Sequence, residues 1–218
     1  MKDGDLTDEV ELKDCLGTRF KSIIDGSIYL TQPRMIGSVL KIVCIDPKNE
    51  IFKLHNYPSY RILDNDPNGK PRKQKCSYRY KVRFLSYIQY VIWPDISITV
   101  QKCSIFFNDP SQEHEETAKL ICRYLLDTKA QGVTLSPDKE KGFECYIYTY
   151  WDLSWQHRLS DDPLSSHSWT RYVLMYSGCP IIWASKIQYL IALSTTEVDY
   201  IVLSTALCKV IRIINLLE

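Results

Sequence analysis

The sequence predicts a mixed α/β (α+β) fold, in which a β-hairpin and several helices are followed by strands and one long helix. Three observations support this prediction. Asp25-Gly26 marks a tight turn between two alternating segments, helical apolar spacing recurs between residues 33 and 128, and strand-like segments follow Gly132. With 218 residues, of which 45% are hydrophobic and 24% charged, the chain is long enough to bury a sizeable core.

The first half of the chain contains the hairpin and a succession of helical segments. Pro33 opens a helix with apolar residues at helical spacing, and residues 46–74, rich in Pro, Asn, Asp and Lys, form a connecting loop. Further stripes predict a helix over residues 78–91 and another that follows Trp93-Pro94 and ends near Phe107. The hairpin itself is expected over residues 19–32.

The next helical segment has a clear predicted start. Asp109 is the expected cap, Pro110 takes the first helical position, and Gln112 lies three residues after the cap. The helix is expected to stop near Thr128, and its apolar face consists of Ala118, Ile121, Cys122 and Leu125. Several helices in a row indicate an α-helical subdomain.

From Gly132 onward the chain changes character. The strand-like segments are Val133–Leu135, Phe143–Trp151, Arg171–Met175 and Ile181–Trp183, and the last two flank a turn around Gly178. Ser194-Thr195-Thr196-Glu197 is a capping box that starts a long helix, with Val198, Ile201, Val202, Thr205, Cys208 and Ile211 at helical spacing. We therefore divide the chain into residues 1–131 and residues 132–218, and the second part is interpreted as β-β-β-α.

Composition excludes several functional classes. The net charge of +1 gives no global attraction to nucleic acid, so any such binding must come from a local patch. No apolar run approaches the ~20 residues that span a bilayer, and the acidic N-terminus lacks a signal-peptide pattern. We expect an intracellular protein, cytoplasmic or nuclear, without a membrane partner. The eight cysteines include no C-x-x-C pair, which favours reduced, mostly buried thiols over a zinc site.

Several motifs together resemble one family. They are DGSIYLTQP (residues 25–33), DPSQEHEETAKLICRYLLDTKAQG (109–132), GCPIIWASK (178–186) and IALSTTEVDYIVLSTAL (191–207). They are similar to the Pol polyprotein of copia-type (Pseudoviridae) retrotransposons. The resemblance implies the palm end and thumb-like helices of a reverse transcriptase in residues 1–131. It also implies a truncated, incomplete RNase H-like domain in residues 132–218.

The strand that should carry the chemistry departs from the family. Copia-type elements have approximately ECYVDADW there, whereas this chain has ECYIYTYW, so that Tyr148 and Tyr150 replace both family aspartates. RNase H cleavage uses two metal ions about 4 Å apart, held by several carboxylates. Asp152 lies four residues from position 148, about 13 Å along an extended strand, and cannot substitute. The Tyr-x-Asp-Asp motif of the polymerase is also absent.

Glu197 is the only residue that matches an RNase H carboxylate. Its alternative role is structural, because Glu is favoured at the third position of a capping box for backbone reasons alone. Without its partners we expect no intact catalytic site, no metal and no cofactor, although the family would use Mg²⁺. The chain as it stands is therefore expected not to be an enzyme.

One basic segment still suggests binding. Residues 70–83 interleave tyrosines with seven basic residues, which are Lys70, Arg72, Lys73, Lys75, Arg79, Lys81 and Arg83. Basic groups neutralise phosphates and aromatic rings stack on unpaired bases, so weak binding of an RNA–DNA hybrid or a single strand is one interpretation. The alternative is a solvated loop that leads into a helix whose charges face water.

Three hypotheses for function remain open at this point. The chain is a degenerate, inactive fragment of a copia-type polyprotein, or a non-catalytic nucleic-acid-binding or interaction module, or part of a gene for an active polymerase and RNase H. We also expect the incomplete sheet after residue 132 to be marginally stable, and to aggregate or self-associate. Trp151, Trp155, Ile181 and Trp183 are expected to add apolar surface without a partner.

The basic segment generates a test by salt dependence. If it follows a nucleic-acid backbone, changing Arg72, Lys73 and Lys75 together to Ala should flatten the dependence of log affinity on log salt by up to about three phosphate contacts. The measurement is a titration of a labelled single strand at several salt concentrations. An unchanged slope would mean that these charges are only solvated.

Overall fold

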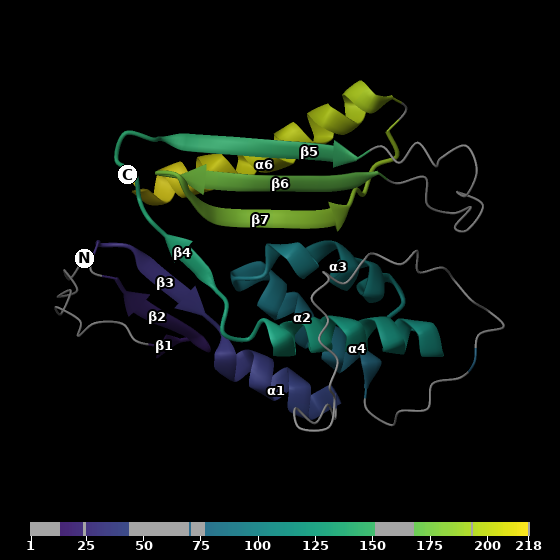
Figure 1. Ribbon diagram of the computed structural model, residues 1–218. Helices are drawn as coiled ribbons and strands as arrows, with labels where there is room; N and C mark the ends of the chain where they lie inside the picture. Colours follow the sequence, from purple (N-terminus) through teal and green to yellow (C-terminus); the bar gives the residue numbers. More distant parts are fainter. Residues whose placement is uncertain are drawn as a thin grey trace, which may run out of the picture.

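The computed structural model describes residues 14–23, 25–43, 70, 77–150, 168–192 and 194–217 of the chain. Within these residues there are two antiparallel sheets, a group of helices beside the first sheet, and a long C-terminal helix (Figure 1). The mixed α/β class predicted from the sequence is confirmed. The predicted loop over residues 46–74 lies outside the described residues, apart from Lys70.

The N-terminal sheet begins with the predicted hairpin. Strands β1 (Asp14–Cys15), β2 (Thr18–Ser22) and β3 (Ile28–Thr31) are antiparallel neighbours. The Asp-Gly turn forms because Gly26 has a φ of 83° and the Asp25 carboxylate accepts a 2.9 Å hydrogen bond from the backbone N–H of Ser27. The backbone hydrogen bond from Ser27 also lowers the pKa of Asp25. The hairpin prediction is confirmed.

Strand β4 (Val133–Leu135) completes this sheet from a distant part of the chain. It pairs with β3 in the register Ile28↔Leu135, Tyr29↔Thr134 and Leu30↔Val133. The sequence grouped this strand with the C-terminal part, and its pairing shows instead that it belongs to the N-terminal sheet. The division of the chain into two domains at residue 132 stays a prediction. Strand β4 lies after that boundary but pairs with a strand that lies before it.

The helical part contains the predicted helices. They are α1 (Pro33–Val43), α2 (Tyr78–Val91), the short 3₁₀ helix η1 (Pro94–Ile96), α3 (Ser97–Ile105) and α4 (Gln112–Asp127). Their apolar stripes form one buried cluster, in which Ile36, Val82, Leu85, Val100 and Ile121 are fully buried. Ala118, Cys122 and Leu125 line the buried face of α4 as predicted.

The start of α4 differs from the prediction. The cap is Ser111 rather than Asp109, since the Ser111 backbone N–H donates to His114 Nδ1 at 2.8 Å and the two side chains form a capping box. The Asp109-Pro110 pattern therefore predicted the start of the helix two residues too early. His114, and not Gln112, makes the side-chain contact back to the backbone of the cap residue. The predicted end near Thr128 is confirmed.

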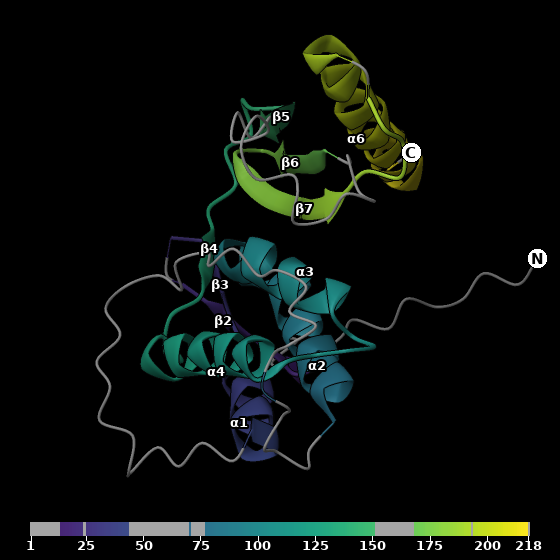
Figure 2. The same cartoon turned by 90° about the vertical axis from the view of Figure 1, so that its right-hand side faces the viewer.

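The C-terminal sheet consists of β5 (Phe143–Tyr150), β6 (Trp169–Tyr176) and β7 (Cys179–Ile187) in that order. Helix α6 (Thr195–Leu217) crosses one face of this sheet, as Figures 1 and 2 show from two directions. The predicted cap is confirmed, because the backbone N–H of Glu197 donates to Ser194 Oγ at 3.1 Å. The predicted β-β-β-α order is therefore present, made of β5, β6, β7 and α6.

Helix α6 also corrects an expectation drawn from composition. Within its 23 residues, an 18-residue stretch has a mean hydropathy of 1.7, so by length and composition this one helix among the described residues could cross a membrane. Only 11% of that stretch is buried. The expectation that no apolar run approaches the length of a membrane span is wrong by length and composition, because this stretch of α6 has no more than two charged residues.

Strand β7 joins the sheet to the helical part. Trp183 is only 8% exposed, and its Nε1–H donates to the Gln89 carbonyl oxygen in α2 at 2.6 Å. Trp183 was expected to lack a partner, so that expectation is wrong. Ile181 remains exposed, and Trp151 and Trp155 lie outside the described residues.

The contact between β3 and the residue before β4 generates a test. A Cβ added at Gly132 would lie 2.0 Å from the Leu30 carbonyl oxygen, so Gly132→Ala must push the two strands apart. We expect a loss of about 2 kcal/mol or more, seen as a melting temperature lower by about 4–8 °C. Gly142→Ala is the matched control, since a Cβ there meets nothing within 4 Å. Equal melting temperatures for the two variants would contradict this packing.

Candidate functional site

The first site position predicted from the sequence is Tyr148 on β5. Tyr148 pairs in register with Arg171 of β6, and Arg171 pairs with Ser185 of β7. The neighbouring residues Tyr172 and Leu174 pack against Ala206 of α6. Because side chains alternate along a strand, Tyr148 lies on the face of the sheet opposite α6, which we call the open face.

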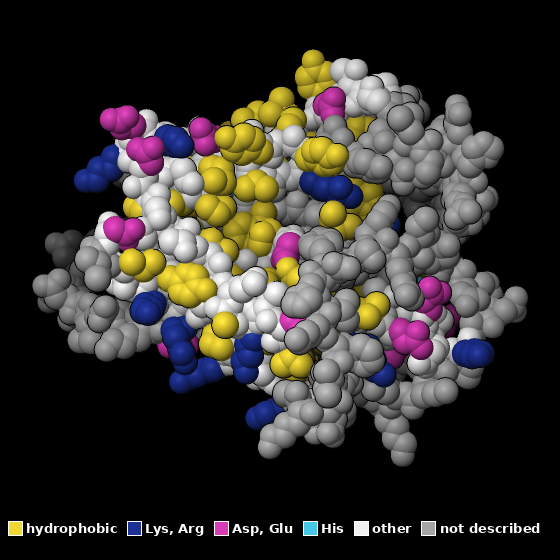
Figure 3. All heavy atoms as spheres, viewed as in Figure 1, with side chains coloured by type: hydrophobic (Ala, Val, Ile, Leu, Met, Phe, Trp, Pro, Cys, Tyr) yellow, Lys and Arg dark blue, Asp and Glu magenta, His cyan; other side chains and the backbone are white. Residues whose placement is uncertain are grey.

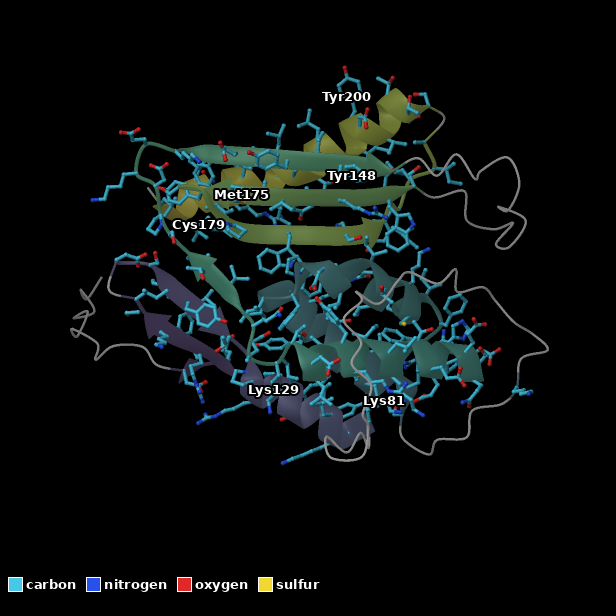
Figure 4. The ribbon with its side chains drawn as sticks, viewed as in Figure 1. Lys81, Lys129, Tyr148, Met175, Cys179 and Tyr200 are labelled. Atoms are coloured by element: carbon cyan, nitrogen blue, oxygen red, sulfur yellow. The ribbon has the colours of Figure 1, made fainter. Side chains whose placement is uncertain are left out.

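The open face carries aromatic and cationic side chains around Tyr148, the position at which an aspartate was expected. Tyr148 is 58% exposed near the end of β5 (Figure 4), and Tyr146 is exposed beside it on the same face. The Arg171 guanidinium lies 6.0 Å from the Tyr148 ring centre and 5.9 Å from the ring of Trp169. Figure 3 looks onto this face and shows hydrophobic side chains gathered over the sheet. The backbone of Tyr150 belongs to β5, but its side chain lies outside what the structure describes.

Glu197 occupies the first turn of α6, which packs against β5 and starts at the end of the sheet where β5 finishes (Figure 1). It is exposed and follows the cap residue Ser194. No group of three or more His, Cys, Asp or Glu residues that could hold a metal ion occurs among the described residues. The expectation of no metal site stays a prediction for the chain as a whole.

The structure separates the seven basic residues into three groups. Lys70, Arg79 and Arg83 are exposed, and Arg79 donates a hydrogen bond to Asn108. Lys81 is completely buried. Arg72, Lys73 and Lys75 lie outside the described residues.

Lys81 was predicted to belong to a nucleic-acid-binding surface, and this prediction is wrong. It is 0% exposed and forms an ion pair with Glu115, which is 1% exposed, so the pair joins α2 to α4 inside the helical core (Figure 4). Its position follows from helical geometry, because Lys81 is three residues from Tyr78 and four from Leu85, both buried on the same face. A residue on that face cannot reach a phosphate backbone.

The cysteines follow the same division between core and surface. Burial raises the pKa of Cys103 and that of Cys122 to about 12, and the nearby Lys81 charge offsets only part of the effect at Cys122. Cys103, Cys122 and Cys179 are buried, whereas Cys15, Cys145 and Cys208 are exposed. All six cysteines among the described residues are free thiols, and three of these six are buried, so the expectation that most are buried is not confirmed for this part of the chain.

The buried pair generates a test on stability and binding together. Lys81→Met leaves the Glu115 carboxylate buried without its cation and should cost about 3–5 kcal/mol of unfolding free energy in urea denaturation. Combining it with Glu115→Leu should recover most of that loss. Arg83→Met on the exposed side of the same helix is the control, expected to change stability by less than about 0.5 kcal/mol.

The double variant then tests whether Lys81 contacts nucleic acid. Its salt dependence of single-strand binding should equal that of the unmodified chain, because the cation removed is not at the surface. A slope reduced by about one phosphate contact would show that Lys81 reaches the ligand after all.

Comparison with known proteins supplies the family. The chain is 30% identical over 194 residues to the retrovirus-related Pol polyprotein from transposon RE1 of Arabidopsis thaliana, a match that covers 88% of this chain and 12% of that protein. It is 28% identical over 208 residues to the corresponding polyprotein from transposon TNT 1-94 of Nicotiana tabacum, covering 91% of this chain and 15% of that protein.

A third relative does not have the name of a Pol polyprotein. The secreted RxLR effector protein 161 of Plasmopara viticola is 30% identical over 129 residues, and the match covers 85% of that protein and 59% of this chain. No family model matches the chain, and no solved structure matches it.

The chain thus spans only 12% and 15% of the two plant polyproteins, yet nearly all of it aligns with them. The chain belongs to the copia-type retrotransposon Pol family and corresponds to a region of that polyprotein.

Proposed function

We propose that this chain is a catalytically inactive remnant of the reverse transcriptase and RNase H region of a copia-type polyprotein. The observation that carries the proposal is Tyr148, which takes the place of the first-strand aspartate and lies beside a guanidinium. On this proposal the hairpin and helices α1–α4 correspond to the palm end and thumb, and β5, β6, β7 and α6 to an incomplete RNase H-like unit.

The chemistry at position 148 supports inactivity in two ways. A phenol has a pKa near 10 and is a poor ligand for a hard cation at neutral pH, which prefers carboxylate oxygens. Arg171 also places a permanent positive charge about 6 Å from the Tyr148 ring centre. A divalent cation bound there would be repelled, so restoring one carboxylate does not by itself restore the electrostatics of a metal site.

The chain corresponds to a small region of its relatives. The polyproteins that the chain matches are many times longer, and the remaining 85–88% of each has no counterpart in this chain. The Tyr-x-Asp-Asp motif expected of the polymerase does not occur in the 218 residues. The hypothesis of a partial gene for an active enzyme requires flanking sequence, and it must also account for Tyr148 and Tyr150, which lie within the chain.

A second candidate function is weak binding of nucleic acid without catalysis. It is favoured by Arg79 and Arg83, which are exposed on α2, and by Lys70, whose carbonyl accepts a 3.1 Å hydrogen bond from Gln112 at the start of α4. That contact holds one end of the basic segment beside the helices. The two proposals are compatible, since charge at the surface does not need an intact metal site.

Hydrolysis of a labelled RNA–DNA hybrid tests the first proposal. With Mg²⁺ or Mn²⁺, the purified chain should cleave no faster than its Glu197→Ala variant, and a known RNase H provides the positive control. Tyr148→Asp alone should also remain inactive, because the other carboxylates are still missing and the positive charge of Arg171 remains nearby. Metal-dependent cleavage by the unmodified chain that Glu197→Ala abolishes would show that the proposal is wrong.

A further inference from the structure

The outer side of helix α6 carries a stripe of exposed apolar side chains. Val198, Val202 and Ala206 are buried on the side that faces the C-terminal sheet. The other side carries what we call the outer stripe, whose members are between 37% and 67% exposed: Tyr200, Leu203, Leu207, Ile211 and Ile214. Among the described elements, α6 packs mainly against β5 and β6, and its outer side lies at the edge of the molecule (Figure 2). A helix that is apolar on both sides is normally covered on both, so the outer stripe indicates an interface.

The spacing of the outer stripe favours a second helix as its partner. Tyr200, Leu207 and Ile214 are seven residues apart, and Leu203 lies three residues after the first of them. This alternation of three and four residues lets the side chains of one helix fit between those of another. A helix that lies on a membrane surface instead has a charged side opposite its apolar side, whereas the opposite side of α6 is buried against the sheet.

The charges of α6 are separated along its length. Glu197 and Asp199 lie near its N-terminal end, whereas Lys209 and Arg212 lie in its C-terminal half, and these four are its charged residues. The sign of each end is the same whatever contacts these side chains make within their own chain. Two copies of α6 placed antiparallel bring each acidic end to a basic end, while a parallel pair brings like charges together. Antiparallel packing also opposes the two helix dipoles.

We propose that the outer stripe binds the outer stripe of a second copy of this chain, with the two α6 helices antiparallel. A two-fold axis that crosses the pair near Thr205 places Leu203 opposite Leu207 of the second copy. The same register brings Glu197 within one residue of Arg212 of the second copy, since opposed positions are symmetric about residue 205. The inference goes beyond the proposed loss of catalysis and does not depend on it, because it needs neither a metal nor a substrate.

An open hollow beside the outer stripe fits the same register. Its volume is about 580 Å³, and its lining includes Leu190, Tyr200 and Ser204 near the N-terminal end of α6. In the proposed pair the C-terminal half of the second helix lies over this end, and it carries the exposed Ile211. Each copy then presents a hollow at one end and exposed apolar residues at the other, which is the self-complementarity of a two-fold interface.

Sedimentation velocity at increasing protein concentration, without nucleic acid, tests the interface. The unmodified chain should form a dimer. Leu203→Glu combined with Leu207→Glu should weaken the dimer by about a hundredfold or more, because the pairing would bury carboxylates without partners. Ile181→Glu on β7 is the matched control, since Ile181 is 37% exposed and Leu203 is 38% exposed, and it should leave the dimer unchanged. If the double variant fails to fold, Leu207→Ser, which adds no charge, serves in its place and should also weaken the dimer.

Charge exchange tests the orientation of the two helices. Glu197→Lys combined with Asp199→Lys should weaken the dimer by about tenfold or more at low salt, because both ends of each helix are then basic. Adding Lys209→Glu and Arg212→Glu should restore it, because the ends are again opposite in sign. In a parallel pair neither change alters the sign of the contacts, since each end faces its own copy. A melting temperature measured for each variant confirms that the folded chains are being compared.

Four outcomes would overturn the proposal. The first three are a chain that stays monomeric up to its solubility limit, a dimer that the folded leucine variants leave intact, and a dimer that is insensitive to charge exchange. The fourth is a monomer that binds phosphatidylcholine vesicles through Leu203 and Leu207, which would assign the outer stripe to lipid. Loss of the dimer in Ile181→Glu alone would assign self-association to the sheet, and this too would contradict the proposal. Cleavage of an RNA–DNA hybrid is measured separately, so failure here leaves the proposal of lost catalysis untouched.

Discussion

Trp183 determines how the C-terminal sheet meets the helices. Its ring is almost fully buried, and its Nε1–H donates to the Gln89 carbonyl oxygen in the last turn of α2. Carbonyls in the last turn of a helix have no partner within the helix, so the indole supplies the hydrogen bond that Gln89 would otherwise lack. Side chains alternate along β7, and the same contact therefore places Ser185 beside α3 and leaves Ala184 for α6. A hollow of about 200 Å³ between the open face, η1 and α3 exists because of this docking.

The helical part is stabilised by an apolar core that also encloses an ion pair. Lys81 and Glu115 are taken out of water together, and each charge is tolerated because the other is adjacent. Such a pair adds little net stability compared with apolar residues of similar size, but it strongly penalises any arrangement in which α2 and α4 separate. The exposed cations Arg79 and Arg83 lie on the other side of α2, so one helix carries both a structural charge and solvent-facing ones.

Helix α6 has two apolar sides and only one of them is covered by the described residues. Val198, Val202 and Ala206 are buried toward the sheet. Tyr200 points away from it (Figure 4), and Leu203, Leu207 and Ile211 are exposed along the outer side. Exposed apolar surface of this kind usually belongs to an interface or to a part of the fold supplied elsewhere. The expected marginal stability and self-association of the C-terminal sheet stay predictions, because they depend on what covers this surface in solution.

The local elements were predictable from sequence because each is specified by residues that are close together in the chain. The Asp-Gly turn, the apolar stripes of α1, α2 and α4, the hairpin around Gly178 and the cap at Ser194 all depend on neighbours within a few positions. The replacement of the family aspartates by Tyr148 and Tyr150 was likewise visible in one strand. These features were enough to predict the fold class, the family and the expected loss of catalysis.

Only the tertiary structure decided which of these elements meet. The pairing of β4 with β3, the burial of Lys81 against Glu115 and the partner of Trp183 join residues that are far apart in sequence. No local pattern reports such contacts, since an apolar stripe does not say what will cover it, and a lysine within a basic run looks the same whether it faces water or a carboxylate. The hollow beside Tyr148 is a further case, because its walls come from β5, β6, β7, η1 and α3, and it forms only when the sheet packs on the helices.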